Sequence, residues 1–383
     1  IFFAEKENGA FFNNHRIRVS KKNELNWRET VDREVISVRN SVGFCDVSTL
    51  GKIDIQGKDA QEFINKIYCN AFAKLSVGKV RYGLMLREDG LVMDDGTTAR
   101  MSENHFIMTT TTANADSVYR HLEFCHQCLW PDMEVHLIST TDAWAQIAIA
   151  GPNSRKVISK IIDPEFDISN ENFPFMACKE ISICGGVIAR LFRISFSGEL
   201  AYELSFPTQY ALSFVNYLME IGKEDNIIPY GTEALGVMRI EKGHAAGAEL
   251  NGTTTALNLN MGKMVSDNKD SIGSVLSKRE GLNQSDDLKL VGIKPINSSD
   301  QLISGSHLFD LSSKVNSQND KGYITSSCFS PTLGSYIALG FLRNGSNRYG
   351  EKIRVNNFLL KKEVLAEICN PIFVDPNGDK LRE

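Results

Sequence analysis

Long apolar runs are missing from this chain of 383 residues, and so is any stretch dense in lysine and arginine. No run approaches the roughly 20 apolar residues that span a bilayer, so we expect no membrane-spanning helix. The net charge is −5, and an acidic chain without basic clusters argues against nucleic acid or a membrane surface as a partner. No signal-peptide pattern precedes the first charged segment. Because the chain begins with Ile1 rather than Met, we expect it to be a piece of a longer polypeptide.

The sequence also lacks the Gly-x-Gly-x-x-Gly pattern, although it holds 29 glycines. That absence predicts no dinucleotide-binding site of the usual type in this chain. Of its eight cysteines only Cys125 and Cys128 are closely spaced, in Cys125-His126-Gln127-Cys128, and His121 could be a third ligand, but no second Cys-x-x-Cys exists. A structural zinc site takes about four ligands, so we expect no metal site. Scattered thiols are typical of a reducing compartment, which predicts a cytoplasmic protein.

What the chain does contain is an internal repeat. With 42% hydrophobic and 23% charged residues it has ordinary globular composition, and its length allows two or three domains. Residues 52–67 align without gaps on residues 146–161. Each copy has the pattern of a short strand, a glycine, a polar helix start and an amphipathic helix, and Pro152 suits the first turn of the second helix. The match predicts two duplicated α+β halves of the ferredoxin-like type.

An acidic β-hairpin follows the first copy of the repeat. Residues 81–96 are apolar on both sides of Glu88-Asp89-Gly90, a turn that uses Asp-Gly chemistry. We expect the second strand to end in Asp94 and Asp95. Neighbouring side chains of a strand point to opposite faces, so one carboxylate should face inward and the other should face solvent or cap the strand end. An inward carboxylate is costly without a partner, which makes the pair a candidate site; we assign the cap to Asp95.

A second hairpin, over residues 188–204 with a turn near Ser197-Gly198, follows the second copy. Two similar halves would place the two acidic hairpins on either side of a shared cleft. Residues 207–219 and 232–242 read as helices. After a polar stretch at 265–288, short β runs at 290–293, 322–325, 336–341 and 352–355 predict a small barrel or jelly roll. The expected divisions are an extension (1–30), a duplicated region (31–275, with halves of about 31–140 and 141–275) and a β domain (276–383).

Three motifs carry a family resemblance. Residues 90–95 resemble the Gly-x-[Val/Ile]-x-Asp-Asp hairpin of the folate-dependent aminomethyltransferases, whose type member is the glycine-cleavage T-protein. Residues 196–203 resemble the Tyr-Thr-Gly-Glu-x-Gly-Tyr-Glu segment of that family, and residues 234–243 resemble its helix ending in Arg-hydrophobic-Glu-x-Gly. The likeness runs from about residue 30 to the C-terminus.

One branch of this family is closer still. Residues 46–54, 93–100, 192–199 and 229–234 match the T-protein-like, C-terminal region of the α subunit of heterotetrameric sarcosine oxidase. T-proteins usually have Asp-Val-Ser-His where this chain has Asp46-Val47-Ser48-Thr49. Four such segments in the same order make the resemblance specific.

The resemblance implies a fold and a set of site residues. It implies three lobes around a central hole that holds tetrahydrofolate, with Asp94 as the catalytic base beside the reacting nitrogens. It also implies that Glu199 binds the pterin edge, where a carboxylate accepts two adjacent N–H donors. The other residues expected to bind folate are Tyr82, Asn114, Arg239 and Tyr202.

The implied activity is one-carbon transfer. The methylene group of oxidised sarcosine would pass to tetrahydrofolate, giving 5,10-methylenetetrahydrofolate and glycine. FAD, FMN and NAD would then lie on other sarcosine oxidase subunits or on a missing N-terminal flavoprotein portion. Two alternatives stay open. One is a stand-alone glycine-cleavage aminomethyltransferase that uses a lipoyl carrier. The other is a non-catalytic folate-binding or assembly module, although residues 242–248 depart from the Lys-Gly-Cys-Tyr-x-Gly-Gln pattern of the known non-enzymatic group.

Overall fold

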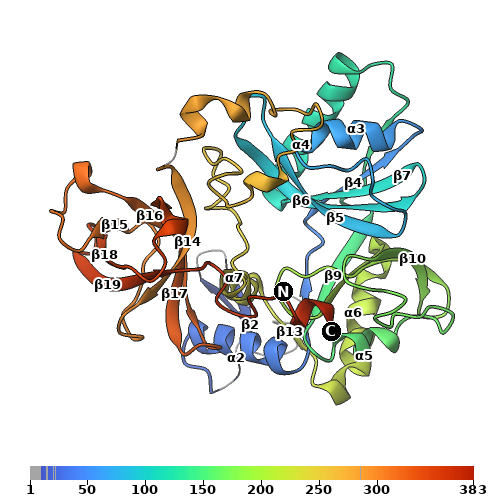
Figure 1. Ribbon diagram of the computed structural model, residues 1–383. Coiled ribbons are helices and arrows are strands. Elements are labelled where there is room, and N and C mark those ends of the chain that lie inside the picture. Colours follow the sequence, from blue (N-terminus) through green and yellow to red (C-terminus); the bar gives the residue numbers. More distant parts are fainter. Residues whose placement is uncertain (1–9, 14–15, 20, 22, 285) are drawn as a thin grey trace.

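The computed structural model describes residues 10–13, 16–19, 21, 23–284 and 286–383. Its elements form three lobes, two built on β-sheets with helices and one built as a barrel (Figure 1). Much of the predicted N-terminal extension lies outside the described residues. The described part of it includes the paired strands β1 (Ala10–Asn13) and β2 (Arg16–Val19).

The first sheet has five strands in the order β5-β6-β7-β4-β8. Their bounds are Lys79–Leu86 (β5), Val92–Ser102 (β6), His105–Thr110 (β7), Gly51–Gln56 (β4) and His136–Ser139 (β8). Helices α3 (Ala60–Ile67) and α4 (Ala115–Phe124) cover one face. That face is apolar because alternate strand residues such as Ile53 and Met108 pack against helix residues such as Phe63 and Leu122.

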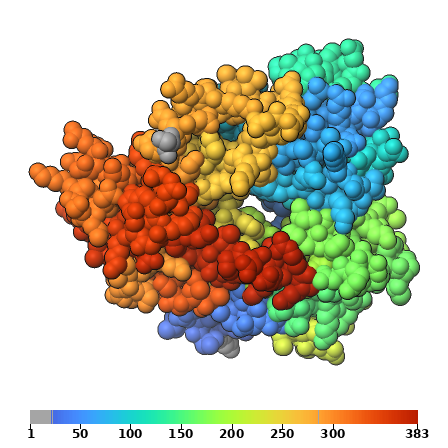
Figure 2. All heavy atoms as spheres, viewed as in Figure 1, coloured from blue at the N-terminus to red at the C-terminus, as the bar shows by residue number. Residues whose placement is uncertain are grey.

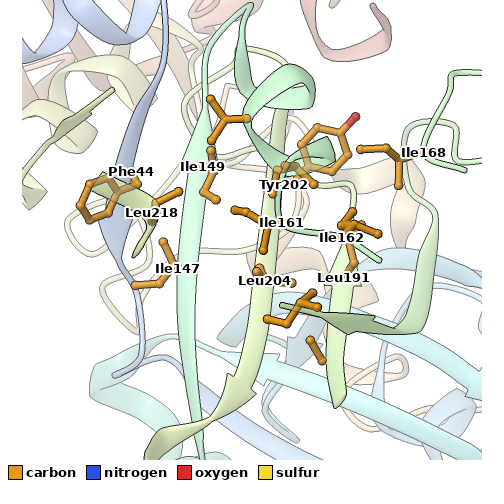
Figure 3. Packing of buried hydrophobic residues seen from close by; sticks show 14 of the residues in the cluster. Phe44, Ile147, Ile149, Ile161, Ile162, Ile168, Leu191, Tyr202, Leu204 and Leu218 are labelled. Carbon is orange, nitrogen blue, oxygen red and sulfur yellow. The ribbon is translucent and has the colours of Figure 1, made fainter. Parts of the chain in front are cut away.

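The second sheet has six strands in the order β10-β11-β12-β9-β3-β13. Their bounds are Cys178–Ile183 (β10), Val187–Phe192 (β11), Ala201–Pro207 (β12), Trp144–Ala150 (β9), Gly43–Asp46 (β3) and Ile228–Pro229 (β13). Helices α5 (Ser154–Ser159) and α6 (Ala211–Ile221) cover one face, and Figure 3 shows Ile147, Ile149 and Leu204 packed in this core with Leu218. Strand β3 comes from the first half of the chain, so this sheet crosses the division expected near residue 140.

The two copies of the repeat form the same local structure. Strand β4 leads through Gly57 into α3, and β9 leads through Gly151 into α5. Both glycines have positive φ, +135° and +124°. A Cβ atom would lie 2.0 Å from the carbonyl oxygen of Glu134 at the first position and 2.4 Å from that of Ser41 at the second. Only glycine combines this backbone conformation with so close an approach, which explains why the repeat aligns on it.

The third lobe is a closed barrel with strand order β14-β17-β16-β15-β18-β19. Its strands are Leu288–Pro295 (β14), His307–Asp310 (β15), Gly322–Ser330 (β16), Ser335–Arg343 (β17), Lys352–Asn357 (β18) and Lys362–Cys369 (β19). Helices α2 (Trp27–Asn40) and α7 (Thr232–Glu241) pack together, and α7 also contacts β16. The predicted α+β fold with a small C-terminal barrel is therefore confirmed.

Short helical segments lie in the connections. They are η1 (Thr112–Asn114), the π-helical η2 (Cys125–Leu129), η3 (Thr208–Tyr210), η4 (Lys223–Asp225), η5 (Gly262–Met264), η6 (Leu276–Lys278), η7 (Glu280–Leu282), η8 (Ser317–Asn319), η9 (Gly345–Asn347) and η10 (Lys380–Arg382). The described residues between 265 and 284, expected to be part of a polar boundary, form turns and short helical segments before β14. Figure 2 shows an opening near the middle of the molecule, bordered by segments from all three lobes.

The acidic hairpin forms as predicted, with one correction. Strands β5 and β6 are antiparallel, and Gly90 in the turn has φ +86°. The second strand does not end at the carboxylates, because β6 continues to Ser102 and its pairing with β5 runs on to Arg100. The two threonines at positions 97 and 98 favour this continuation, since β-branched residues suit a pleated strand. Asp94 and Asp95 therefore lie inside the sheet.

Candidate site between the two sheets

The faces of the two sheets that carry no helices lie toward each other. Arg190 on β11 reaches Asp54 on β4 with 3.2 Å between the guanidinium nitrogen and the carboxylate oxygen. Val80 and Ile107 of the first sheet also share an apolar cluster with Phe192 of the second. These contacts join the two faces along one side. Polar side chains that alternate with the helix-facing residues therefore look into the space between the sheets.

Asp94 points to the helix-covered face of the first sheet. It lies opposite Met85, a residue of the core under α3 and α4. Its carboxylate, only 1% exposed, accepts three hydrogen bonds: from the backbone N–H of Thr111 (3.1 Å), the hydroxyl of Thr111 (2.7 Å) and the amide of Asn114 (2.9 Å). Burial raises the pKa of Asp94, and these hydrogen bonds oppose the rise. The structure thus brings the predicted residues Asp94 and Asn114 together as partners of each other.

Asp95 points the other way, to the face of the first sheet that carries no helices. It lies opposite Leu84, and the Tyr82 hydroxyl donates to its Oδ2 at 2.8 Å. Burial is the main cause that raises the pKa of Asp95 to about 6, although the side chain keeps some accessible surface. The expectation that Asp95 caps a strand end or faces solvent is wrong, because β6 continues past it. Tyr82, also predicted at the site, has its pKa raised by burial and by the Asp95 carboxylate.

Glu199 is held by two cations. Its Oε1 accepts from Arg39 at 2.7 Å and from Lys380 at 2.8 Å, and the side chain is 3% exposed. Arg39 also binds the buried Glu241 of α7, at 2.5 Å and 3.1 Å from its Oε2. The predicted pterin-binding carboxylate is therefore the centre of an ion network that joins α2, α7 and the C-terminal residues.

Tyr202 and Glu203 lie on opposite faces of β12. The Tyr202 ring is fully buried in the core beneath α5, and its hydroxyl accepts a hydrogen bond from Arg155 at 2.9 Å (Figure 3). That position is away from the space between the sheets, so it does not support the predicted folate contact. Glu203 looks into that space and accepts a hydrogen bond from Gln146. Burial raises the pKa of Glu203 to about 7.

Sequence reasoning missed Glu203. The signal was present, because Glu203 stands between the apolar residues Tyr202 and Leu204 in a mostly apolar strand. Burial of a carboxylate at such a position is costly without a hydrogen-bond or charge partner, as it is for Asp94. What the sequence did not supply was the face of the strand that the helices cover.

Arg239 joins α7 to the barrel. Its guanidinium donates to the buried Glu249 at 2.8 Å and to the hydroxyl of Ser326 on β16 at 2.7 Å. Among the described residues, Arg239 forms no hydrogen bond or ion pair with Glu199, Asp94 or Asn114. Its predicted binding of the glutamate part of folate stays a prediction.

The closely spaced cysteines form no cluster of ligands. Cys125 is buried in η2 and Cys128 is exposed, and His121 lies 3.6 Å from the sulfur of Cys125. Within the described ranges, no group of three or more His, Cys, Asp or Glu residues is placed to hold a metal ion. Among the helices of those ranges, none is long and apolar enough to cross a membrane.

Two family models match consecutive parts of this chain. Residues 3–269 match the GCVT N-terminal domain, and residues 289–375 match the glycine cleavage T-protein C-terminal barrel domain. The chain belongs to the glycine cleavage T-protein family. This confirms the resemblance read from residues 90–95, 196–203 and 234–243, and the second match coincides with the closed barrel of this T-protein family member.

Relatives of two kinds resemble this T-protein family member. It is 53% identical to the sarcosine oxidase subunit alpha of Rhizobium meliloti over 363 residues, and 40% identical to that of Corynebacterium sp. strain U-96 over 357 residues. These matches take in 94% and 92% of the chain but only 37% and 36% of the relatives. It is also 30% identical to an aminomethyltransferase of Chloroherpeton thalassium, with 84% of each chain matched.

A solved structure has the same fold. The glycine cleavage system aminomethyltransferase T from Bartonella henselae superposes with a TM-score of 0.80, covering 98% of this chain and 97% of the other. The two are 21% identical. The likeness establishes the arrangement of all three lobes as that of a T-protein.

Proposed function

We propose that this chain is the folate-binding, one-carbon-transfer module of a sarcosine oxidase. It would accept the methylene group of oxidised sarcosine onto tetrahydrofolate, giving 5,10-methylenetetrahydrofolate and glycine. The observation that carries the proposal is the pair of part-buried carboxylates, Asp95 and Glu203, on facing sheets of a T-protein fold. The 53% identity to a sarcosine oxidase subunit alpha supports the choice within the family.

The carboxylates have the chemistry that a reduced folate needs. A pterin presents adjacent N–H donors along one edge, and an ionised carboxylate accepts two of them together. Within the described residues the Glu203 carboxylate accepts a hydrogen bond from Gln146 alone, and so keeps acceptor sites for a ligand. Glu199 is less suited to this role than predicted, since Arg39 and Lys380 both bind its Oε1.

Proton transfer is the second task of the site. Tetrahydrofolate supplies the nucleophilic nitrogens, whose protons must be removed as the carbon is bound. A carboxylate with a pKa near the working pH is an effective general base and also stabilises positive charge. The resemblance assigns this role to Asp94, and that assignment stays a prediction. The geometry favours Asp95, because Asp94 is engaged by three donors on the helix-covered face while Asp95, with a pKa of about 6, lies on the face without helices.

Partners complete the proposed enzyme. We propose that FAD, FMN and NAD are bound by other sarcosine oxidase subunits or by an N-terminal flavoprotein portion, and that the assembly works in the cytoplasm. The chain spans little more than a third of the sarcosine oxidase relatives, which supports a division of the chemistry. Neither nucleic acid nor a membrane is a proposed partner.

A stand-alone aminomethyltransferase is the second candidate. Its support is that the chain matches 84% of the Chloroherpeton aminomethyltransferase, with no large part of that relative left over. The two candidates differ in the source of the carbon. Aminomethyl transfer from a lipoylated carrier protein to tetrahydrofolate, measured with this chain alone, would favour the second. A non-catalytic folate-binding or assembly module would show neither reaction.

Calorimetric titration of the chain with 5-formyltetrahydrofolate tests the binding function. We expect one saturable site, and Glu203→Gln should weaken binding about 10- to 100-fold because a charged hydrogen-bond partner is worth about 1.5–3 kcal/mol. Glu367→Gln, at an exposed glutamate of the barrel strand β19, is the matched control and should bind as the wild type does. Absence of heat at millimolar ligand would overturn the proposal.

A further inference from the structure

Glu203 is held by a neighbour on the adjacent strand. Strands β12 and β9 are antiparallel, with Ser205 opposite Gln146 and Glu203 opposite Ala148. The side chains of Gln146 and Glu203 are therefore diagonal neighbours on the face between the sheets. Gln146, 1% exposed, donates its amide N–H to Oε2 of Glu203.

A hydrogen bond from Ser205 fixes the orientation of the Gln146 side-chain amide. The hydroxyl of Ser205, itself 1% exposed, donates to Oε1 of Gln146 at 2.8 Å. With its oxygen taken in this way, the amide presents its NH₂ group to the carboxylate. The backbone of Gln146 is fixed as well, because its N–H donates to the Ser48 hydroxyl at 2.9 Å and its carbonyl accepts from Val47 at 2.9 Å.

A buried lysine of the other sheet provides charge near the same carboxylate. Lys52 on β4 is 2% exposed, and its ammonium donates to the carbonyls of Ser48 (2.7 Å) and Leu50 (3.1 Å). It lies opposite Thr109, whose hydroxyl bonds to Thr97, so it belongs to the face that looks toward the second sheet. Burial lowers the pKa of Lys52 to about 8, while nearby carboxylates, Glu203 among them, oppose that change.

Few other titratable or charged groups act on Glu203. From β11 the charged residue on the same face is Arg190, which is paired with Asp54. The titratable residue of β3 near Glu203 is Cys45, and the one that follows β13 is Tyr230. Burial raises the pKa of both side chains, so both are neutral near pH 7. Lys52 is thus the cation that favours the ionised form of Glu203, and Gln146 donates a hydrogen bond to the same carboxylate.

We propose that Gln146, oriented by Ser205, positions Glu203 for recognition of the folate ring, and that Lys52 balances the charge of this carboxylate. The inference rests on the proposed function and deepens it. Gln146 and Lys52 are positioning residues, since they act through Glu203. Only the ionised carboxylate can accept two N–H donors, so folate affinity should rise as pH rises through about 7. Loss of the Gln146 donor destabilises the ionised form and should move this rise to higher pH.

The test is the affinity of the full chain for 5-formyltetrahydrofolate, measured by calorimetry between pH 5.5 and 8.5. In Gln146→Met the midpoint of the pH profile should move up by about one pH unit, with affinity about 10-fold lower at pH 7 and largely recovered at pH 8.5. A merely structural loss would lower affinity equally at every pH. Gln209→Met, at an exposed glutamine of η3, is the matched control and should leave the profile unchanged.

Two further results decide the matter. Ser205→Ala keeps Gln146 in place but frees its amide, so it should move the midpoint in the same direction by a smaller amount. This variant keeps the test decisive if Gln146→Met does not fold. A wild type that binds folate, with variants whose pH profiles match it, would overturn the inference and leave the proposed function standing. A wild type that does not bind would instead overturn the proposed function.

Discussion

Adjacent residues of a strand meet opposite surroundings in this protein, and two such pairs define the site. Asp94 binds Thr111 and Asn114 beneath the helices, whereas Asp95 meets Tyr82 on the other face. Tyr202 is a core residue, and Glu203 beside it faces the first sheet. The chemistry of each residue therefore follows from its face more than from its type.

Exchange of each aspartate for asparagine separates the two roles. In the complete oxidase, Asp95→Asn should lower formation of 5,10-methylenetetrahydrofolate on the order of 10²-fold, since a general base contributes about that much. The carbon should then appear as formaldehyde while sarcosine oxidation continues. Asp94→Asn should chiefly lower stability, by about 1–3 kcal/mol, through the hydrogen bonds of Thr111 and Asn114. If Asp94→Asn abolishes folate product and Asp95→Asn does not, the resemblance-based assignment is right and ours is wrong.

The pKa of Glu203 makes stability depend on pH. In the unfolded chain this carboxyl has its ordinary pKa of 4.5, and in the folded protein burial raises it to about 7. Folding favours the protonated form of Glu203. The stability that this carboxyl contributes is therefore fully present below pH 4.5 and is lost as pH rises through about 7. Glu203→Gln should therefore raise the free energy of unfolding at pH 8, by at most about 3 kcal/mol, and change it little at pH 4.5. Urea unfolding at both pH values measures this; an equal effect at both would contradict it.

The sequence predicted the carboxylate pair and the alternation, but not the face. Both strands of the acidic hairpin are rich in apolar residues on both faces. One face packs under α3 and α4, and the other packs partly against residues 240–265 and the barrel and partly against the second sheet. No periodicity distinguishes these two environments. The face follows only from the pairing of Asp94 with Met85, which is a tertiary fact.

At the scale of elements, a repeated unit of strand, glycine and helix determines the local structure in both halves of the duplicated region. Gly57 and Gly151 turn the chain with positive φ where a Cβ would meet a backbone carbonyl. The gapless alignment of residues 52–67 on 146–161 made this unit predictable. The continuation of β6 past Asp95 was not predicted, since the paired carboxylates looked like a strand end.

Alanine at Gly151 should destabilise the protein by about 2–4 kcal/mol, because it combines an unfavourable φ with a clash against the carbonyls of Ser41 and Val38. Gly186→Ala is the matched control. Gly186 has φ +122°, but a Cβ there would have no atom of the described residues within 4 Å, so the variant meets conformational strain alone and should lose about 1 kcal/mol. Equal losses in chemical denaturation would show that the close approach contributes nothing.

At the scale of the whole molecule, a buried ion network ties the lobes together. Arg39 of α2 binds Glu199 of the second half and Glu241 of α7, and Glu241 also accepts from Ser330 of the barrel. Lys380, close to the C-terminal residue, reaches Glu199. The sequence predicted the three lobes through the family resemblance. It did not predict this network, because its members are far apart in the chain and only Glu199 among them was assigned a role.

Arg39→Met should destabilise the protein by about 3–5 kcal/mol, since it leaves two buried carboxylates without their shared cation. Arg120→Met is the control, because Arg120 pairs with Asp116 at the surface with side chains 75% and 73% exposed, and such pairs contribute about 0–1 kcal/mol. Urea unfolding measures both. If Arg39→Met unfolds at the same urea concentration as the wild type, the network does not hold the lobes together.

The central claim is that the space between the two sheets binds a reduced folate. A crystal structure of this chain with 5-formyltetrahydrofolate tests it most directly. We predict that the pterin edge lies within hydrogen-bond distance of the Glu203 carboxylate and that Asp95 faces the nitrogens that carry the transferred carbon. Ligand ordered elsewhere on the protein, or an empty space between the sheets in crystals grown at a concentration that saturates binding in solution, would contradict the account.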